Sequence, residues 1–451
     1  MMESMDDDAF WDQVERDDGG VDGGDSDDGD AGPSVKLELA GITVAWLLKQ
    51  GGTWHEGILL DEARSRGVFV MVDPKGGGVR AGERLVRAPL AATLSSAAAA
   101  DDADVRRVTG GGRAEAFGLL LLLTLKKLQE AEKTPYVAFL ESCCDGDFLR
   151  PPDVGAGPLK DHLWAVVDDQ DRVFDAAARP LLNADACFAD VDATAYACAR
   201  KLIETRAFQL NGSASTREDA VQALVPGCDF FNYASPSPTR LVVDDGYVSI
   251  VATANLHPDH GEVFWDYASV NGSPLVLLSQ YGFLPDALDG PRARHVVPLK
   301  VAGAVGELLD GACVAPDVDG ADDGPLRRRR AASVKFCRDL EATPIARAAP
   351  KPPSAVVWWV DVDAPDESPL LLALRAALAA PDELRKRDRT VADWIRPLES
   401  NEAGARAAFR DAAKAVFDGH WRAEAAPTRV GRAARDYQIA HLSRLMARLD
   451  E

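Results

Sequence analysis

The chain has 451 residues, of which 47% are hydrophobic, an ordinary proportion for a globular protein with a sizeable buried core. Its 72 acidic residues outnumber its 50 basic residues, and 13 of the acidic residues lie within residues 1–31, where Arg16 is the one basic residue. Residues 1–31 therefore have a net charge of −12, and the other 420 residues have about −10 of the total −22. No global positive field exists to attract nucleic acid or an anionic membrane, so we expect neither as a partner.

The seven cysteines form no C-x-x-C pair: Cys143, Cys144, Cys187, Cys198, Cys228, Cys313 and Cys337. An odd number without metal-ligand spacing is typical of free thiols in a reducing compartment, so we expect no metal site. The longest apolar run, residues 116–123, is too short to span a membrane, and the acidic N-terminus is unlike a signal or transit peptide. We expect an intracellular protein in the cytoplasm, with the nucleus as the other possible location.

Residues 1–34 consist mostly of Asp, Gly and Ser, with Phe10 and Trp11 as an aromatic pair. Such a segment buries too little apolar surface to offset the entropy lost on ordering. We therefore predict a disordered acidic tail.

Residues 35–95 are predicted to be mainly strands joined by tight turns. A short amphipathic helix is expected first, over residues 42–48, ending at Gly51 and Gly52. Apolar and partly β-branched runs then predict three strands: residues 57–60, 67–72 and 84–89.

Residues 96–204 have a different residue pattern, which predicts a helical insert. A helix over residues 114–133 is apolar nearly all round, which indicates that it is buried, and a second helix is expected over residues 193–208. Residues 205–285 return to short strands, at 241–243, 247–252 and 262–267.

The remainder of the chain is predicted to be helical after a connector. Residues 286–367 are rich in Asp, Gly, Ala and Arg, which indicates a loop-heavy connector with one helix near residues 301–309. From residue 368 onward the sequence predicts an all-α C-terminal domain with helices at residues 370–379, 405–417 and 433–449. The fold class is therefore α+β: a β-rich part interrupted by a helical insert and followed by this domain.

Common catalytic motifs are absent from the sequence. His257 and His260 have the H-x-x-H spacing of a metal site, but Pro258, Asp259 and Gly261 around them predict a turn. No G-x-G-x-x-G, P-loop or G-x-S-x-G motif is present, which removes the usual basis for a kinase or serine hydrolase.

Three ordered motifs in the later part of the chain are more informative. They are LVPGCDFFNY at residues 224–233, GEVFWDY at 261–267 and LLSQYGF at 277–283, and TRAF at 205–208 precedes them. Their order and spacing resemble the C-terminal half of SET-domain protein methyltransferases of the Rubisco large-subunit methyltransferase class.

The earlier part resembles the first half of the same family. The matching segments are WLL at residues 46–48 with Gly51, RGVF at 66–69, AGE at 81–83, Pro89, and the insert helix with Pro135, Tyr136 and Leu140. The resemblance covers residues 35–451 and implies a split SET fold: an N-terminal part at 35–95, a helical insert at 96–204, a C-terminal part at 205–285, the connector at 286–367, and a substrate-binding-like helical domain at 368–451.

The resemblance implies S-adenosylmethionine as the cofactor and, as acceptor, a lysine or rarely a histidine of a protein substrate. In this family's terms Tyr267 is the catalytic residue, orienting the acceptor amine, and Asn232 holds the polar end of the cofactor. Arg206 and Asp229 are the charged or hydrogen-bonding partners nearby.

The remaining site residues are implied in the same way. The backbone at Arg66 and Gly67 meets the cofactor, and Tyr281 and Phe283 form an aromatic wall. Tyr233 stands at the family's cofactor-binding histidine. The protein substrate is expected to bind through the SET groove and the C-terminal helical domain, with the enzyme as a monomer.

The sequence departs from the family pattern at several positions. Tyr233 replaces the histidine, Ser65 replaces a glycine, Ala268 follows the catalytic tyrosine in place of a glycine, and residues 271–276 lengthen the next loop. Two hypotheses therefore stand: an active protein-lysine N-methyltransferase, and a SET-derived peptide-binding module with weak or lost turnover. The retained Asn232, Tyr267 and Arg206 favour the first.

The acidic tail gives a first test. Because a segment of like charges repels itself rather than packing, deleting residues 1–34 should leave the melting temperature unchanged within error. A clear loss of thermal stability, measured by calorimetry on the two proteins, would mean that Phe10 and Trp11 dock on the folded part.

Overall fold

The computed structural model describes residues 34–63, 67–110, 115–144, 148–154, 159–160, 163, 174–183, 185–210, 221–267, 274–284, 295–301, 303–313, 328–334, 357–379, 401–422 and 429–450. The chain divides into two compact units. The first combines Met1–Arg150 with Ala178–Ser269, and the second combines Pro151–Ala177 with Val270–Glu451. Residues 274–284, expected in the SET C-terminal part, thus belong with the second unit. The acidic tail up to residue 33, Arg66 and the loop at 268–273 lie outside the described residues.

The first unit begins with α2, Val35–Lys49, which is longer than the helix expected at residues 42–48. Its start is set by Ser34, whose hydroxyl accepts a hydrogen bond from the backbone N–H of Leu37 at 3.2 Å and so caps the helix. The helix ends at Lys49, with Gln50 as its C-cap before Gly51, which has a positive φ of 85°. Its buried face, which includes Ala40 and Leu47, packs against α6, Pro135–Ser142, and the neighbouring strands.

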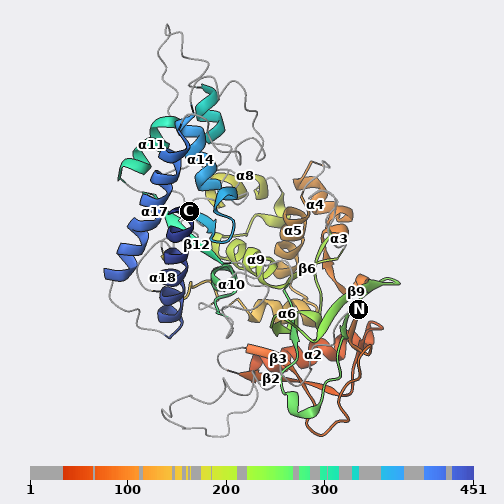
Figure 1. Ribbon diagram of the computed structural model, residues 1–451. Helices are drawn as coiled ribbons and strands as arrows, with labels where there is room; N and C mark the ends of the chain where they lie inside the picture. Colours follow the sequence, from red (N-terminus) through yellow and green to blue (C-terminus); the bar gives the residue numbers. More distant parts are fainter. Residues whose placement is uncertain are drawn as a thin grey trace. The chain divides into compact units, whose positions relative to one another are not determined.

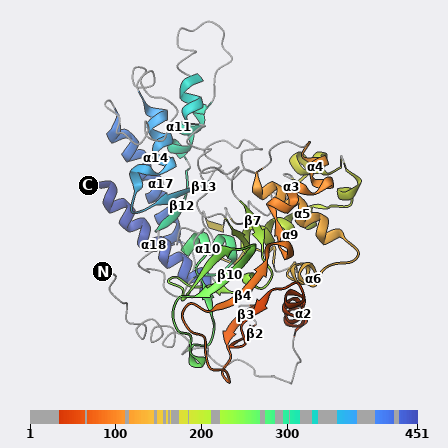
Figure 2. The same cartoon turned by 90° about the vertical axis from the view of Figure 1, so that its right-hand side faces the viewer.

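Strands from both sides of the insert pair with one another. In the four-stranded sheet the order is β1 (Thr53–Trp54), β4 (Arg84–Pro89), β10 (Tyr247–Ala252) and β9 (Thr239–Asp244), all antiparallel. Figure 2 shows β4 beside β10, although about 160 residues separate them in sequence. A second sheet also joins strands from both sides of the insert. In it β5 (Leu94–Ser95) pairs with β7 (Gln222–Leu224), which also pairs with β6 (Ala207–Gln209). Two further pairs complete this unit: antiparallel β2 (Ile58–Ala63) with β3 (Gly67–Val72), and parallel β8 (Asn232–Tyr233) with β11 (Phe264–Trp265).

The described residues between these strands include several helices. They are α3 (Ser96–Asp101), α4 (Ala103–Val108), α5 (Ala116–Gln129), α6, α8 (Arg179–Leu182) and α9 (Ala193–Arg206), and α3, α4 and α5 pack together (Figure 2). The apolar α5 is largely buried, as expected, but it stops at Gln129 and a new helix, α6, begins at Pro135 with Thr134 as its cap. Helix α9 ends at Arg206 rather than residue 208, because Ala207–Gln209 pairs with β7 as a strand.

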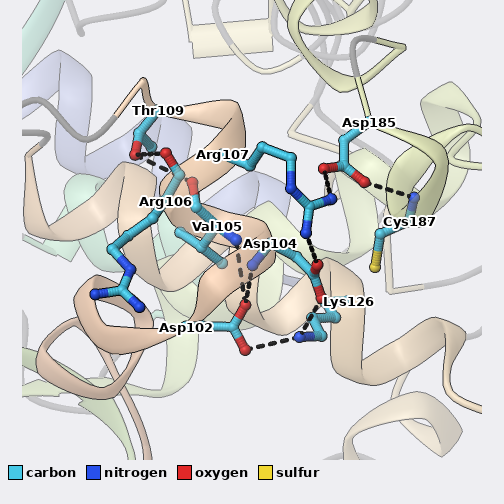
Figure 3. A network of polar contacts seen from close by, with 9 residues as sticks. All are labelled: Asp102, Asp104, Val105, Arg106, Arg107, Thr109, Lys126, Asp185 and Cys187. Atoms are coloured by element: carbon cyan, nitrogen blue, oxygen red, sulfur yellow. Dashed lines mark hydrogen bonds and ion pairs between the residues drawn. The ribbon is translucent and has the colours of Figure 1, made fainter.

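A charged network joins α4 to α5 inside this helical part (Figure 3). The ammonium of Lys126 lies 2.7 Å from carboxylate oxygens of both Asp102 and Asp104. Arg107 bridges Asp104 and Asp185 at the other end of the network. Burial by itself lowers the pKa of Lys126, but the two carboxylates outweigh it and raise that pKa above its ordinary value.

The second unit contains a two-stranded antiparallel sheet that the sequence patterns did not indicate. Strands β12 (Val296–Lys300) and β13 (Val357–Asp361) lie within the segment predicted to be a loop-heavy connector. Val297, Pro298 and Leu299 on one strand and Trp358 and Val360 on the other are buried. Val297, Leu299, Trp358 and Val360 belong to the hydrophobic core of the unit.

Helices surround this small sheet. They are α10 (Pro274–Tyr281), α11 (Gly303–Cys313), α14 (Pro369–Leu378), α17 (Glu402–Arg422) and α18 (Arg429–Asp450), and α17 and α18 lie side by side (Figure 1). The described residues from 368 onward are helical, as predicted for this part of the chain, apart from single residues at the helix ends. Buried Arg375 of α14 is held by Asp366 and by Glu402 of α17, at 3.0 and 2.6 Å. Within the described part of the chain, no helix has the length and apolar character needed to cross a membrane.

The network around Lys126 gives a second test. Lys126→Met removes the cation shared by Asp102 and Asp104 and leaves Asp104 with Arg107 alone, so the free energy of unfolding should fall at pH 7. The pKa values of both carboxyls are lowered in the folded protein, so their stabilising effect is present above pH 3.8 and disappears as the pH falls through the folded-state values. Denaturant unfolding should therefore show a smaller effect of the substitution at pH 3 than at pH 7.

Lys127→Met is the matched control, because among the described residues Lys127 pairs with the partly exposed Glu130 alone, at 2.6 Å within one helical turn. Its effect should be small at both pH values. An equal loss for Lys126→Met at pH 3 and pH 7 would contradict an electrostatic role for the network.

Candidate functional site

A tight turn in the first unit positions several of the predicted site residues. Gly227 has a φ of 83°, and the turn continues through a short 3₁₀ helix, Cys228–Phe230, into strand β8. A Cβ added at Gly227 would lie 3.2 Å from Val86 and 3.3 Å from Leu47. Both the backbone conformation and the close packing therefore favour glycine here, and they fix the direction in which the chain leaves the turn.

Asp229 in this turn has a fully buried side chain with two partners from distant segments. The Arg206 guanidinium at the end of α9 donates from Nη1 to the Asp229 backbone carbonyl at 3.2 Å and to Oδ2 at 3.4 Å. The hydroxyl of Tyr136 in α6 donates to the same Oδ2 at 3.0 Å. The other oxygen, Oδ1, is buried with no hydrogen-bond partner among the described residues.

Burial dominates the electrostatics of this cluster. It raises the pKa of Asp229 to about 6, and the nearby Arg206 charge and the Tyr136 hydrogen bond only partly offset it. Burial, together with the Asp229 charge, raises the pKa of Tyr136 well above its ordinary value, so Tyr136 stays a neutral donor. The pKa of Arg206 is raised, because the neighbouring Cys143 and Asp229 outweigh the effect of its burial.

Asn232 lies three residues beyond Asp229, in strand β8. Its side-chain Nδ2 donates to Oε1 of Glu262 at 2.7 Å, and Glu262 is only 9% exposed. Because a carboxylate can only accept, this bond directs the Asn232 amide nitrogen towards Glu262 and leaves its carbonyl oxygen facing the other way.

Tyr267 lies just beyond β11, the strand that pairs in parallel with β8. Its hydroxyl donates to the backbone carbonyl of Phe231 at 3.2 Å, and its ring lies 5.3 Å from that of Tyr233 between centroids. Burial, followed by the charge of Asp266, raises the pKa of Tyr233. The short β8–β11 pair thus brings Asn232, Tyr233 and Tyr267 together with the Asp229 turn.

The structure leaves the other predicted site residues untested. Gly67 begins strand β3 with a φ of 68°, and Arg66 beside it lies outside the described residues. Tyr281 and Phe283 belong to the second unit, where their rings lie 6.2 Å apart at the end of α10.

Three contributors to the site were not predicted from the sequence as functional residues: Tyr136, Cys143 and Glu262. Tyr136 and Glu262 stood inside matched motifs, but nothing in their spacing indicated partners that lie 93 and 30 residues away. The sequence indicates only that Cys143 is one of several free thiols, whereas in the structure its sulfur accepts a hydrogen bond from Nη2 of Arg206 at 3.5 Å.

No protein-family model and no curated protein matches the sequence. Solved structures do share its fold. The SET domain of LSMT bound to lysine and AdoHcy matches with a TM-score of 0.57 at 14% identity, over 93% of this chain and 92% of that chain. Rubisco LSMT bound to AdoMet matches with a TM-score of 0.57 at 14% identity, over 93% and 91%. Rubisco LSMT bound to sinefungin and monomethyllysine matches with a TM-score of 0.55 at 14% identity, over 92% and 90%.

These likenesses establish the fold. The chain has an α+β, SET-like fold with a helical C-terminal region, and the fold predicted from the ordered motifs is confirmed.

The turn before Asp229 gives a third test. Gly227→Ala forces an L-residue into a positive φ and pushes its methyl group against Val86 and Leu47, so the free energy of unfolding should fall by about 1–3 kcal/mol. Gly246→Ala is the control, because Gly246 has a similar φ of 79° but open space around the added carbon. Its loss should be smaller in the same denaturant titration. Equal losses would mean that close packing at the turn contributes nothing.

Proposed function

We propose that this protein is an S-adenosylmethionine-dependent N-methyltransferase that acts on a lysine side chain of a protein substrate. The observation that supports this most strongly is the position of Tyr267. Its hydroxyl lies 3.2 Å from the Phe231 carbonyl. The strand that precedes Tyr267, β11, pairs with β8, which contains Asn232, within a SET fold. Solved proteins of this fold have been seen with AdoMet, AdoHcy, lysine and methyllysine bound.

The residues around the turn fit the amino-acid end of such a cofactor. That end carries one carboxylate and one ammonium group. Arg206, whose side chain is 24% exposed, offers a cation, and the Asn232 carbonyl oxygen, directed away from Glu262, offers an acceptor. When bound, the cofactor supplies a methyl group made electrophilic by its sulfonium.

The acceptor must be a neutral amine, because an ammonium has no lone pair for the methyl group. A free lysine has a pKa of about 10.4, so a narrow, partly apolar entrance that disfavours the charged form assists the reaction. The rings of Tyr233 and Tyr267, 5.3 Å apart, are suited to forming part of such an entrance.

Tyr267 is suited to orient this amine. A hydroxyl that donates to the Phe231 carbonyl still has lone pairs with which to accept from an amine N–H. Together, the hydroxyl and the carbonyl can fix the direction of the amine lone pair. Holding the reacting groups in line in this way is the main contribution expected of the protein.

A second candidate function is a peptide-binding module with weak or lost turnover. It is favoured by Tyr233, which occupies the position of the family histidine and packs against Tyr267. Under either function we propose a protein partner that engages the SET groove and the C-terminal helices, and a monomer in the cytoplasm or nucleus.

The role of Tyr267 gives a fourth test. Tyr267→Phe should reduce methyl transfer by roughly 10²-fold or more, the effect typical of removing a hydrogen bond needed in the transition state. Cofactor affinity should barely change, because the ring remains and the hydroxyl faces the acceptor. The measurement is transfer of labelled methyl groups to protein extracts, with AdoHcy binding by calorimetry alongside. Full turnover by Tyr267→Phe would contradict the mechanism.

Substitutions at Asn232 and Tyr233 separate the two candidate functions. Asn232→Ala should weaken cofactor binding before it affects turnover, the reverse of Tyr267→Phe. Tyr233→His should strengthen binding if tyrosine represents a partial loss, and weaken it if the site has adapted to tyrosine. If wild-type protein neither binds AdoHcy nor methylates any substrate, the binding-module function is the correct one.

A further inference from the structure

One helix of the insert supports the Arg206–Asp229 pair from a single face. Tyr136, Phe139 and Cys143 are spaced i, i+3 and i+7 along α6 and its cap, so they lie on the same side of the helix. All three are buried.

Each of these side chains makes a different contact with the pair. The Tyr136 hydroxyl donates to Asp229 Oδ2 at 3.0 Å. The Phe139 ring lies under the Arg206 guanidinium at 5.3 Å and meets Phe230 edge-on at 4.9 Å. The Cys143 sulfur accepts from Arg206 Nη2 at 3.5 Å.

We propose that α6 is the positioning element of the cofactor site, and that Tyr136 is a positioning residue that acts through the Asp229 carboxylate on Arg206. This inference rests on the proposed function. Tyr136 is 1% exposed, and its hydroxyl donates to Asp229. It therefore acts on a bound ligand through Asp229 and Arg206 and does not contact the ligand itself.

The physical role of the hydroxyl is to keep a buried carboxylate charged. An ionised Asp229 holds the Arg206 guanidinium in place, whereas a neutral carboxyl holds it much less strongly. The titratable groups that face Asp229 are Arg206 from α9, Tyr136 from α6, and Cys228 from its own turn. Cys143 at the end of α6 and Tyr267 lie beside Arg206. Of these, only Arg206 and Tyr136 favour the ionised form.

The test is the pH profile of AdoHcy affinity, measured by calorimetry on the full chain between pH 5 and 8. In the wild type the affinity should fall as the pH drops through the Asp229 pKa of about 6. Tyr136→Phe should move this midpoint upward by roughly one pH unit, the size expected for losing one hydrogen bond to a charged group. At pH 7 its affinity should be roughly twofold weaker, because about half of the Asp229 carboxyls would then be neutral.

Two controls separate this role from a simple packing defect. Tyr247→Phe also removes a hydroxyl from the first unit, on β10, and should leave the midpoint in place. In an Asp229→Asn background the effect of Tyr136→Phe should largely disappear, because no titrating carboxyl remains. An unmoved midpoint in Tyr136→Phe, or the same loss of affinity in both backgrounds, would overturn the proposal.

A ligand-free measurement distinguishes failure of this inference from failure of the proposed function. The Asp229 pKa is raised from 3.8 to about 6, so the unfolded chain loses this proton first and stability falls between those pH values as the pH rises. In Tyr136→Phe that fall should extend above pH 6. Absent AdoHcy binding in the wild type would overturn the proposed function, while this unfolding profile would still decide whether Tyr136 holds the charge.

If Tyr136→Phe does not fold, Cys143→Ala provides the test. It removes another Arg206 contact from the same helix face, so the affinity at pH 7 should fall with the midpoint unmoved. Unchanged affinity would overturn the role of α6.

Discussion

The buried carboxylate of Asp229 is the constraint on which the site depends. A charge removed from water must be paired and hydrogen-bonded, or it becomes neutral. The chain meets this requirement with Arg206 from the end of α9 and Tyr136 from α6, two helices of the insert. Electrostatic as well as apolar contacts therefore hold the helical insert against the turn that leads into Asn232.

The strand pairings explain how residues so far apart in sequence reach one another. The β4–β10 and β5–β7 pairs close the chain around the insert, so α6 and α9 are held beside the Asp229 turn. Gly227 sets the turn, β8 presents Asn232, and the parallel partner β11 brings Tyr267 to the Phe231 carbonyl. The backbone geometry of the turn and the long-range strand pairing thus together bring Asn232, Tyr267 and the Asp229 turn into one small region of the first unit.

The parts of this arrangement with strong local patterns could be predicted from the sequence. The β-branched run at residues 247–252 and the run ending at Pro89 became β10 and β4 with the expected bounds. Strands β12 and β13 were not predicted, because Asp-, Gly- and Arg-rich segments surround them and their partner lies far away in sequence. The same limit applies to Tyr136: its motif placed it on a helix, but only tertiary packing shows that its hydroxyl meets Asp229.

We propose that this SET fold holds a cofactor site built on Arg206 and Asn232. Its most direct test is a calorimetric titration of the full chain with S-adenosylmethionine at pH 7.5, alongside Arg206→Ala. The account predicts saturable binding at one site per chain in the wild type and strongly weakened binding in the variant. No measurable heat of binding in the folded wild type, or equal affinity in the two proteins, would contradict it.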